Sequence, residues 1–197
     1  MGKQIQFWFD FASTYSYLSA MRIERDAKAH GVSVSWQPFL LGPIFAEQGW
    51  NNSPFNIYPA KGRYMKRDME RLCAERNLPL RRPEEFPQNS LKAARAAIAI
   101  ESSDQRADFV RAVFTAQFGS GRNISDDAVL TECLVEADTP AELLIRTQDK
   151  DIKTALFAQV DQAKALGIFG APSFVVGDEL FWGDDRLDSA ISLAAEI

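Results

Sequence analysis

The sequence predicts an α/β fold in which strands at both ends of the chain enclose a long helical segment. Three observations lead to this prediction. Residues 5–38 show strand-like, then helix-like, then strand-like patterns; residues 41–163 show helical periodicity with no strand-like run; and strand-like runs return after residue 167. Alternating and aromatic-rich runs are typical of strands, whereas apolar residues three or four apart are typical of helices.

The first 40 residues predict a strand–helix–strand unit. Residues 5–11 are rich in aromatic side chains, as strands often are. After a short polar break, Ala20, Ile23 and Ala27 recur at helical spacing, and Gly31 stands where a left-handed residue would end one helix. Residues 32–38 alternate again and predict a second strand. A right-handed crossover of this kind makes the two strands parallel.

The middle of the chain predicts a loop-rich stretch followed by helices. Residues 41–62 are punctuated by Gly, Pro and Asn, which favour turns. Helical periodicity then covers residues 64–76, resumes at 91–98 and returns at 110–118. Thr139-Pro140-Ala141-Glu142 matches a capping box with proline at the first helical position, so a further helix is expected to start there.

The end of the chain predicts a hairpin and a final helix. Residues 173–176 and 179–182 flank a Gly177-Asp178 turn, and an amphipathic run follows. The order βαβ, helical block, ββα is that of an α/β thioredoxin-like core interrupted by an all-helical insertion domain. We therefore expect residues 1–41 and 164–197 to form a discontinuous thioredoxin-like domain, and residues 42–163 to form the inserted helical domain.

Composition narrows the function classes. The 197 residues are 46% hydrophobic and 25% charged, as in a soluble globular protein, and the net charge of −5 lacks the basic excess of a nucleic-acid-binding surface. No signal peptide or membrane-spanning run is visible. Cys73 and Cys133 form no CxxC pair and, with the single His30, make no zinc-site pattern. We expect a cytoplasmic protein with buried thiols, no metal, no nucleic-acid partner and no membrane partner.

Ser13 and Thr14 lie where the first strand meets the first helix. The N–H groups at a helix N-terminus are unpaired and favour an anion, and a hydroxyl there could donate a hydrogen bond to a thiolate or oxyanion. The alternative is that Ser13 only caps the helix, a position in which serine is strongly preferred. The pattern itself leaves both interpretations open.

Two motifs near the end of the chain could bind a ligand. If the bond before Pro172 were cis, the backbone of Ala171 would be free to pair with a peptide-like ligand; the alternative is an ordinary trans proline at a strand start. In the Trp182–Arg186 segment, Asp184 or Asp185 could cap the last helix or bind a ligand ammonium group.

Together these motifs resemble the kappa-class glutathione transferases and, more closely, the bacterial 2-hydroxychromene-2-carboxylate isomerases of the DsbA-like thioredoxin superfamily. The resemblance covers nearly the whole chain. It is carried by the segments FDFASTYSYL, FLLGPIF, NNSPFNIYPAKGRYMKRD, FGAPSF and WGDDR.

The resemblance implies a glutathione site. Ser13 takes the place of a redox cysteine and would be the catalytic residue that holds the glutathione thiolate, while the backbone of Ala171, before a cis Pro172, would pair with the cysteinyl unit. Asn52 and Lys61 match further polar contacts. The γ-glutamyl end would lie among Trp182, Gly183, Asp184 and Asp185.

Three positions depart from the family pattern. Thr14 replaces a proline, Asp184 replaces Ser or Asn, and Phe45 stands near the place of a basic residue expected to meet a substrate carboxylate. Aromatic residues around this segment are expected to belong partly to the core and partly to an apolar pocket that faces Ser13; they are Phe39, Trp50, Phe55 and Tyr64.

The resemblance implies cis–trans isomerisation of a conjugated aromatic acid, 2-hydroxychromene-2-carboxylate, by reversible thiolate addition. The partners would be an aromatic or apolar electrophile and a second copy of the chain in a homodimer. One alternative is a kappa-like glutathione transferase or peroxidase. Another is a redox-inactive DsbA-like binding protein, since the chain has no CxxC pair.

Overall fold

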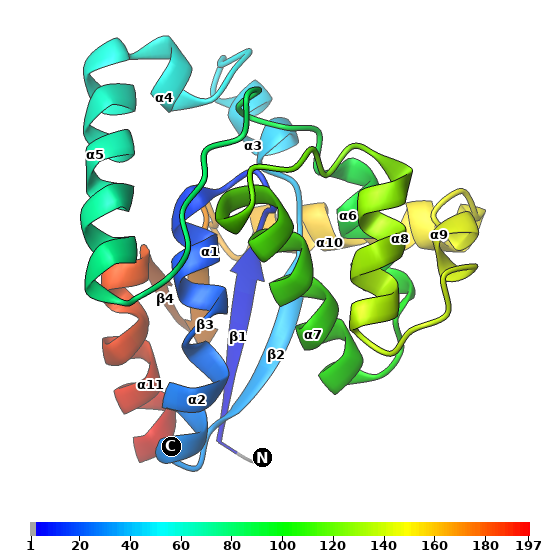
Figure 1. The fold of residues 1–197 in the computed structure, drawn as a ribbon. Coiled ribbons are helices and arrows are strands. Elements are labelled where there is room, and N and C mark those ends of the chain that lie inside the picture. The colour runs from blue at the N-terminus through cyan, green and yellow to red at the C-terminus, as the bar shows by residue number, and fades with distance from the viewer. Residues whose placement is uncertain (1–2) are drawn as a thin grey trace.

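The computed structural model describes residues 3–197, and its four strands form a single mixed sheet (Figure 1). The spatial order is β2-β1-β3-β4, in which β1 and β2 are parallel and the other neighbours are antiparallel. This confirms the predicted strand–helix–strand opening and the hairpin near the end. The strands are β1 (Gln4–Phe9), β2 (Ser33–Pro38), β3 (Ser173–Val176) and β4 (Glu179–Trp182).

Between residues 39 and 172, the described chain contains helices and loops and no strand, as the periodicity predicted. A π-helical turn (Thr115–Gly119) extends α7, and a 3-10 turn (Asp184–Arg186) precedes α11. The helices are α1 (Thr14–Ala20), α2 (Ile23–Ala29), α3 (Leu41–Glu47), α4 (Pro54–Ile57), α5 (Pro59–Glu75), α6 (Leu91–Ala99), α7 (Ser103–Phe114), α8 (Asp127–Glu136), α9 (Leu143–Arg146), α10 (Lys150–Ala165) and α11 (Leu187–Glu196).

Both faces of the sheet are covered, because successive side chains of β1 point to opposite sides. Phe7 and Phe9 face a large core with α1, α2, α5, α7 and α11, whereas Trp8 faces a smaller core with α3 and α10. All three aromatic side chains are fully buried. Burial of each is worth roughly 1.5–3 kcal/mol, so this one strand anchors both layers and fixes the position of the loop that follows it.

The helical segment shares these cores. Side chains of α5 and α7 lie in the larger core. Val160 and Ala163 of α10 lie in the smaller core, on the face of the sheet to which Trp8 points. The domain boundary expected between residues 163 and 164 falls inside α10, which continues to Ala165. The residues expected to form an insertion also complete the packing of the thioredoxin-like sheet.

The structure corrects three sequence-based expectations. The single helix expected before Gly31 is two helices, α1 and α2, because the chain turns where Arg22 directs its guanidinium to Asp184 and Asp188. Gly31 has the expected left-handed conformation (φ +69°). The expected loop-rich stretch is largely helical, with prolines at the first turns of α4 and α5, where the missing N–H has no partner to lose.

The capping box at Thr139 is the third correction. The Thr139 hydroxyl donates to the carbonyl of Ala137, and the side chain makes no cap for the following residues. The chain forms a turn there, a four-residue α9 follows, and the long helix α10 begins only at Lys150. The Thr139 hydroxyl therefore bonds to a carbonyl two residues before it instead of capping a helix after it, and the predicted capping box does not form.

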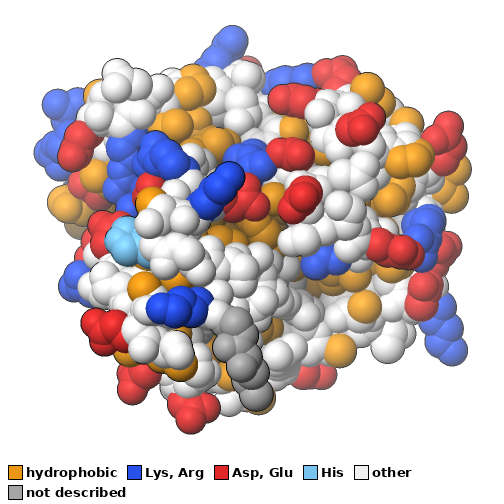
Figure 2. Space-filling model, turned by 90° about the horizontal axis from the view of Figure 1, so that it is seen from below, with side chains coloured by type: hydrophobic (Ala, Val, Ile, Leu, Met, Phe, Trp, Pro, Cys, Tyr) orange, Lys and Arg blue, Asp and Glu red, His pale blue; other side chains and the backbone are white. Residues whose placement is uncertain are grey.

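On the face seen in Figure 2, basic and acidic side chains are interspersed with apolar ones. None of the helices described between residues 3 and 197 has the length and apolar character needed to cross a membrane.

Candidate functional site

Ser13 occupies the point where the end of β1, the start of α1 and the turn before β3 meet. Its Oγ accepts a hydrogen bond from the N–H of Ser16 (3.2 Å), so Ser13 is the N-cap of α1. The same hydroxyl donates to the carbonyl of Ala171 (2.8 Å). Capping therefore does not exclude a binding role, because the proton of the hydroxyl points away from the helix, toward the turn of Ala171.

The Ala171–Pro172 bond is cis, and its turn is tied to the segment after β4. The carbonyl of Pro172 accepts from the N–H of Gly183 (2.9 Å), while the carbonyl of Ala171 accepts from Ser13. The N–H of Ala171 donates to no group in residues 3–197. The structure thus brings together Ser13, Ala171, Pro172 and Gly183, and it leaves one backbone donor free beside them.

Gly183 is a position that only glycine fits well. Its φ is +105°, and a Cβ built there would lie 2.6 Å from Oδ1 of Asp185. Trp182 is 53% exposed and packs against Phe169 with ring centroids 5.0 Å apart. The side chains of this segment that a ligand could reach are the Trp182 ring, the Asp185 carboxylate and the Arg186 guanidinium, which lies 3.4 Å from that carboxylate.

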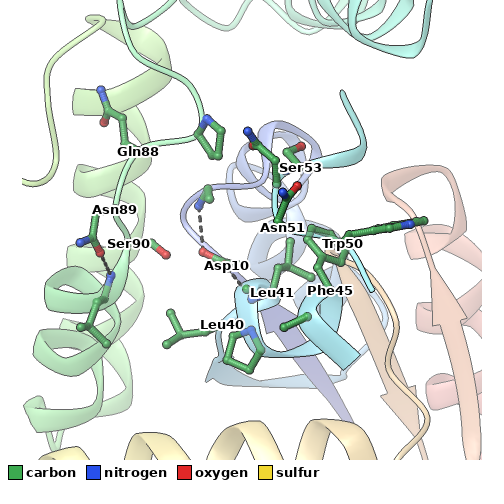
Figure 3. Close-up of a pocket in the computed structure, with 17 residues that line it drawn as sticks. Asp10, Leu40, Leu41, Phe45, Trp50, Asn51, Ser53, Gln88, Asn89 and Ser90 are labelled. Carbon is green, nitrogen blue, oxygen red and sulfur yellow. Dashed lines mark hydrogen bonds between the residues drawn. The ribbon is translucent and has the colours of Figure 1, made fainter. Parts of the chain in front are cut away.

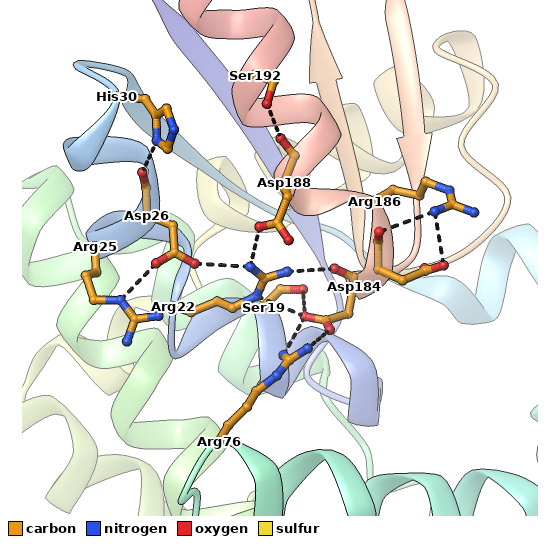
Figure 4. A network of polar contacts seen from close by, with 11 residues as sticks. Ser19, Arg22, Arg25, Asp26, His30, Arg76, Asp184, Arg186, Asp188 and Ser192 are labelled. Carbon is orange, nitrogen blue, oxygen red and sulfur yellow. Dashed lines mark hydrogen bonds and ion pairs between the residues drawn. The ribbon is translucent and has the colours of Figure 1, made fainter.

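Asp184, by contrast, is 4% exposed and belongs to a polar network within the protein (Figure 4). Its carboxylate accepts from both terminal nitrogens of Arg76 (3.1 and 2.6 Å) and from the hydroxyl of Ser19 (2.9 Å). Arg22 donates to its carbonyl oxygen (3.0 Å). The side chain is thus already occupied by protein groups, and Asp184 can offer a ligand only its backbone.

Thr14, the neighbour of Ser13, points elsewhere. It is 6% exposed, its hydroxyl has no hydrogen-bond partner in the described chain, and it lines a cavity of about 230 Å³ bounded by α5 and the loop around Arg82. Of the two adjacent hydroxyls, only that of Ser13 contacts the cis-proline turn.

A larger cavity, of about 480 Å³, opens beside Ala12 (Figure 3). The side chains of Phe45 and Trp50 form an aromatic wall, with ring centroids 5.5 Å apart. The cavity is lined by Asp10, Ala12, Leu40, Leu41, Gly42, Pro43, Phe45, Ala46, Trp50, Asn51, Asn52, Ser53, Pro87, Gln88, Asn89, Ser90 and Leu91.

The aromatic residues expected at this pocket divide as follows. Trp50 lines the cavity and Phe39 is fully buried in the core, as expected. Phe55 is half-buried, contacts Tyr15 and packs against the larger core, so it also matches the core part of this expectation. Tyr64 is exposed on α5 and belongs neither to the core nor to the cavity lining, so for this residue the expectation was wrong. Tyr64 is the one aromatic residue of α5, and the buried positions of this helix are Gly62, Met65, Met69 and Cys73.

Asn52 and Lys61 are separated by the structure. Asn52 lines the larger cavity, and its Oδ1 accepts from the side chain of Asn56 (3.1 Å), which also donates to the carbonyl of Phe86 (3.0 Å). Lys61 is exposed on α5, and its Nζ lies 5.0 Å from the ring centroid of Tyr58. Asn52 therefore belongs to the cavity, whereas Lys61 lies outside its lining.

Asp10 is a cavity residue that sequence reasoning missed. It is 3% exposed, and its two oxygens accept from the backbone N–H groups of Ala12 (2.9 Å) and Leu41 (2.7 Å). Burial raises the pKa of this carboxyl, against the opposing effect of these bonds and of the Ser90 hydroxyl. A usable signal was present, since an acidic residue follows directly on an apolar strand and stands three residues before Ser13.

The two thiols take no part in this site. Cys73 and Cys133 are buried and free, as expected, and burial raises their pKa values to about 11 and about 12. Thiols with raised pKa values are poor nucleophiles at neutral pH.

A serine faces the cis-proline turn, and the chain has no CxxC pair, so the fold and site define a thioredoxin-like protein without a dithiol redox centre. The comparison with protein families agrees. Residues 4–192 match the DSBA-like thioredoxin domain, and the chain belongs to this family.

Known relatives narrow the position within the family. The 2-hydroxychromene-2-carboxylate isomerase of Sphingobium xenophagum is 31% identical, over 95% of this chain and 96% of that protein. Glutathione S-transferase kappa 1 of Homo sapiens is 23% identical, over 98% of this chain and 92% of that protein. A solved structure of a 2-hydroxychromene-2-carboxylate isomerase superposes with a TM-score of 0.88 at 24% identity, covering 98% of this chain and 95% of that one. The chain is thus a homologue of two kinds of enzyme.

Proposed function

We propose that the chain is a glutathione-dependent isomerase of the 2-hydroxychromene-2-carboxylate isomerase type, which interconverts cis and trans forms of a conjugated aromatic compound. One observation supports this most strongly. The Ser13 hydroxyl lies at the N-terminus of α1, 2.8 Å from the carbonyl of the residue before cis Pro172. A thiol placed at this point would meet a hydrogen-bond donor and the positive end of a helix.

The residues present fit glutathione. The free N–H of Ala171 and its carbonyl offer a donor and an acceptor to the backbone of a cysteinyl unit, in the manner of an added strand. Gly183 and Asp185 lie beside this turn and would take the γ-glutamyl end, with Trp182 as an apolar wall. Asn52, and Lys61 farther along the chain, would meet the other end. When bound, glutathione would supply the thiolate that adds reversibly to the conjugated carbon.

Ser13 would hold that thiolate by hydrogen bonding and form no covalent bond itself. Its proton is directed at the Ala171 carbonyl, so a ligand N–H that takes over this carbonyl frees the hydroxyl to turn toward the thiolate. The oxygen already accepts a hydrogen bond from Ser16, which makes the hydroxyl a stronger donor. The substrate would lie in the 480 Å³ cavity beside Ala12, against the wall of Phe45 and Trp50.

The enzymatic alternative is a kappa-like transferase or peroxidase, supported by the kappa-class relatives. Stoichiometry separates the two activities. An isomerase returns free glutathione after each turnover, whereas a transferase or peroxidase consumes it.

The experiment is a turnover assay with a conjugated cis-benzylidene substrate, in which product and free thiol are counted together. Many product molecules per glutathione, with the thiol recovered, support the isomerase. Loss of one thiol per product favours the alternative. Calorimetry that detects no glutathione binding would refute both and leave a redox-inactive binding protein. Cytoplasmic location and a homodimer belong to this proposal and are tested by fractionation and light scattering.

A further inference from the structure

The lining of the larger cavity carries almost no charge. Among its 17 lining residues there is no lysine, arginine or histidine, and the one ionisable side chain is the carboxyl of Asp10. Lys61, a cation farther along the chain, stacks on Tyr58 outside this lining. A negatively charged substrate group in the cavity would therefore leave water without meeting a counter-ion, which is costly.

Two acidic groups add to this effect. Asp10 lies in the cavity wall between Ser90 and Asn51 (Figure 3) and accepts from two backbone N–H groups, while burial, the larger effect, raises the pKa of its carboxyl. The proposed thiolate at Ser13 would lie one residue beyond Ala12, another part of the same wall. An anionic substrate would thus bind close to the like charge of the thiolate and beside a carboxyl instead of a cation.

The polar groups of the cavity are suited to a neutral carbonyl compound. The side chain of Asn51 makes no hydrogen bond within residues 3–197. The Oδ1 of Asn89 accepts from the N–H of Leu91 (3.0 Å), and its Nδ2 has no acceptor in the same part of the chain. These amides can donate to a carbonyl oxygen. Phe45 and Trp50 offer an apolar surface for an aromatic ring.

We propose that the substrate held in this cavity is an uncharged conjugated aromatic carbonyl compound, an enone, ester or amide, and not an aromatic carboxylate. The inference rests on the proposed function and specifies its substrate. In the isomerisation, a S–C bond forms as the C=C electrons move onto the carbonyl oxygen, and it breaks as they return. No oxidant, reductant or net proton is consumed. An amide donor stabilises the oxygen while it carries charge.

The smaller cavity is the competing place for an anion, since Lys66 and Arg82 line it. It has about half the volume, and its arginine is already paired with an acidic side chain. Arg82 donates to Glu70 and to the carbonyl of Lys66, and Glu84 lies in the same wall. The test therefore has to distinguish the two cavities.

The test is calorimetric binding of two probes of equal shape, trans-cinnamamide and trans-cinnamate, to the protein saturated with glutathione. Near neutral pH only cinnamate is charged. We expect the amide to bind at least about tenfold more tightly than the acid. Equal or tighter binding of cinnamate, or binding of neither probe, would overturn the inference.

A lysine introduced into the lining of the larger cavity shows whether the probes bind there. Phe45→Lys should raise the affinity for cinnamate by about tenfold or more, whereas Gln48→Lys, at the C-cap of the same helix but outside the lining, should leave it unchanged. If Phe45→Lys folds, as checked by circular dichroism, and changes nothing, the probes do not lie in this cavity and the inference fails. If Arg82→Gln abolishes cinnamate binding, the smaller cavity is the site and the inference also fails.

Titration of glutathione alone, carried out before the probes are added, separates this inference from the proposed function. Glutathione binding followed by a preference for cinnamate refutes only the inference on substrate charge. Absence of glutathione binding refutes the proposed function itself.

Discussion

The hydroxyl of Ser13 and the carbonyl of Ala171, 158 residues apart in the chain, are joined by a hydrogen bond of 2.8 Å. This bond connects the N-terminus of the first helix to the cis-proline turn, and it lies where a thiol is proposed to bind. The backbone N–H of Ala171 remains free beside it. A ligand with a peptide backbone could therefore exchange partners with Ser13 without any movement of the sheet.

Ser13→Ala removes both the cap of α1 and the proposed thiolate donor. We expect a loss of about 1 kcal/mol in the free energy of unfolding and a fall in turnover on the order of 10²-fold, by analogy with the loss of one oxyanion donor. Steady-state kinetics and urea unfolding measure the two effects. Thr14→Val is the matched control, because the Thr14 hydroxyl has no partner and its loss should leave turnover within about twofold.

Arg76→Ala breaks the ion pair that ties the end of α5 to the segment after β4. Because the Asp184 carboxylate is buried, the loss of a partner should lower the free energy of unfolding by about 3 kcal/mol. Urea unfolding measures this loss. Arg25→Ala removes an exposed guanidinium from its pair with Asp26 and should cost less than about 1 kcal/mol. Equal losses for the two variants would show that the Asp184 network is not a structural anchor.

Asp10→Asn tests the buried carboxyl at the cavity. One backbone N–H would face the amide NH₂, and at acidic pH we expect a loss of about 1–2 kcal/mol in the free energy of unfolding. The folded-state pKa is raised above the ordinary 3.8, so the folded protein binds this proton more readily than the unfolded chain. The stabilising contribution is therefore complete below the ordinary pKa and is lost as the pH rises through the raised value.

Urea unfolding of the native protein and of Asp10→Asn at several pH values measures this difference. Its decrease with rising pH agrees with a carboxyl whose pKa is raised by burial. An increase with pH would mean that the backbone N–H groups win and that the folded-state pKa is lowered.

The two thiols should resist alkylation in the folded protein. Their pKa values of about 11 and about 12 leave little thiolate at mildly alkaline pH, and both side chains are buried. Mass spectrometry after iodoacetamide treatment should find no modification in the native protein and two modified cysteines in denaturant. Rapid native labelling of either one would contradict the packing described around them.

The local parts of the fold were predictable from the sequence, and the long-range parts were not. Aromatic runs and Gly31 indicated the parallel strands, and the Gly177-Asp178 turn indicated the hairpin. The break at Arg22 depends on acidic partners more than 160 residues later, which no local pattern reveals.

The same distinction holds at the site. The sequence motifs indicated Ser13, Ala171 and Gly183, and the fold brings these three together. The engagement of Asp184 by Arg76 could not be foreseen, because their spacing of 108 residues carries no periodic signal. Asp10 was missed for a related reason: its role depends on the N–H of Leu41, which only the tertiary structure places beside it.

The most direct test of the central claim is the pKa of the glutathione thiol in the bound state, followed by the ultraviolet absorbance of the thiolate as the pH is raised. If Ser13 and the start of α1 stabilise the thiolate, the pKa should fall by about one unit or more below the ordinary thiol value near 8.5. Ser13→Ala should restore most of this difference, and Thr14→Val should not. A bound thiol that titrates like free glutathione in the native protein would contradict the proposed role of Ser13.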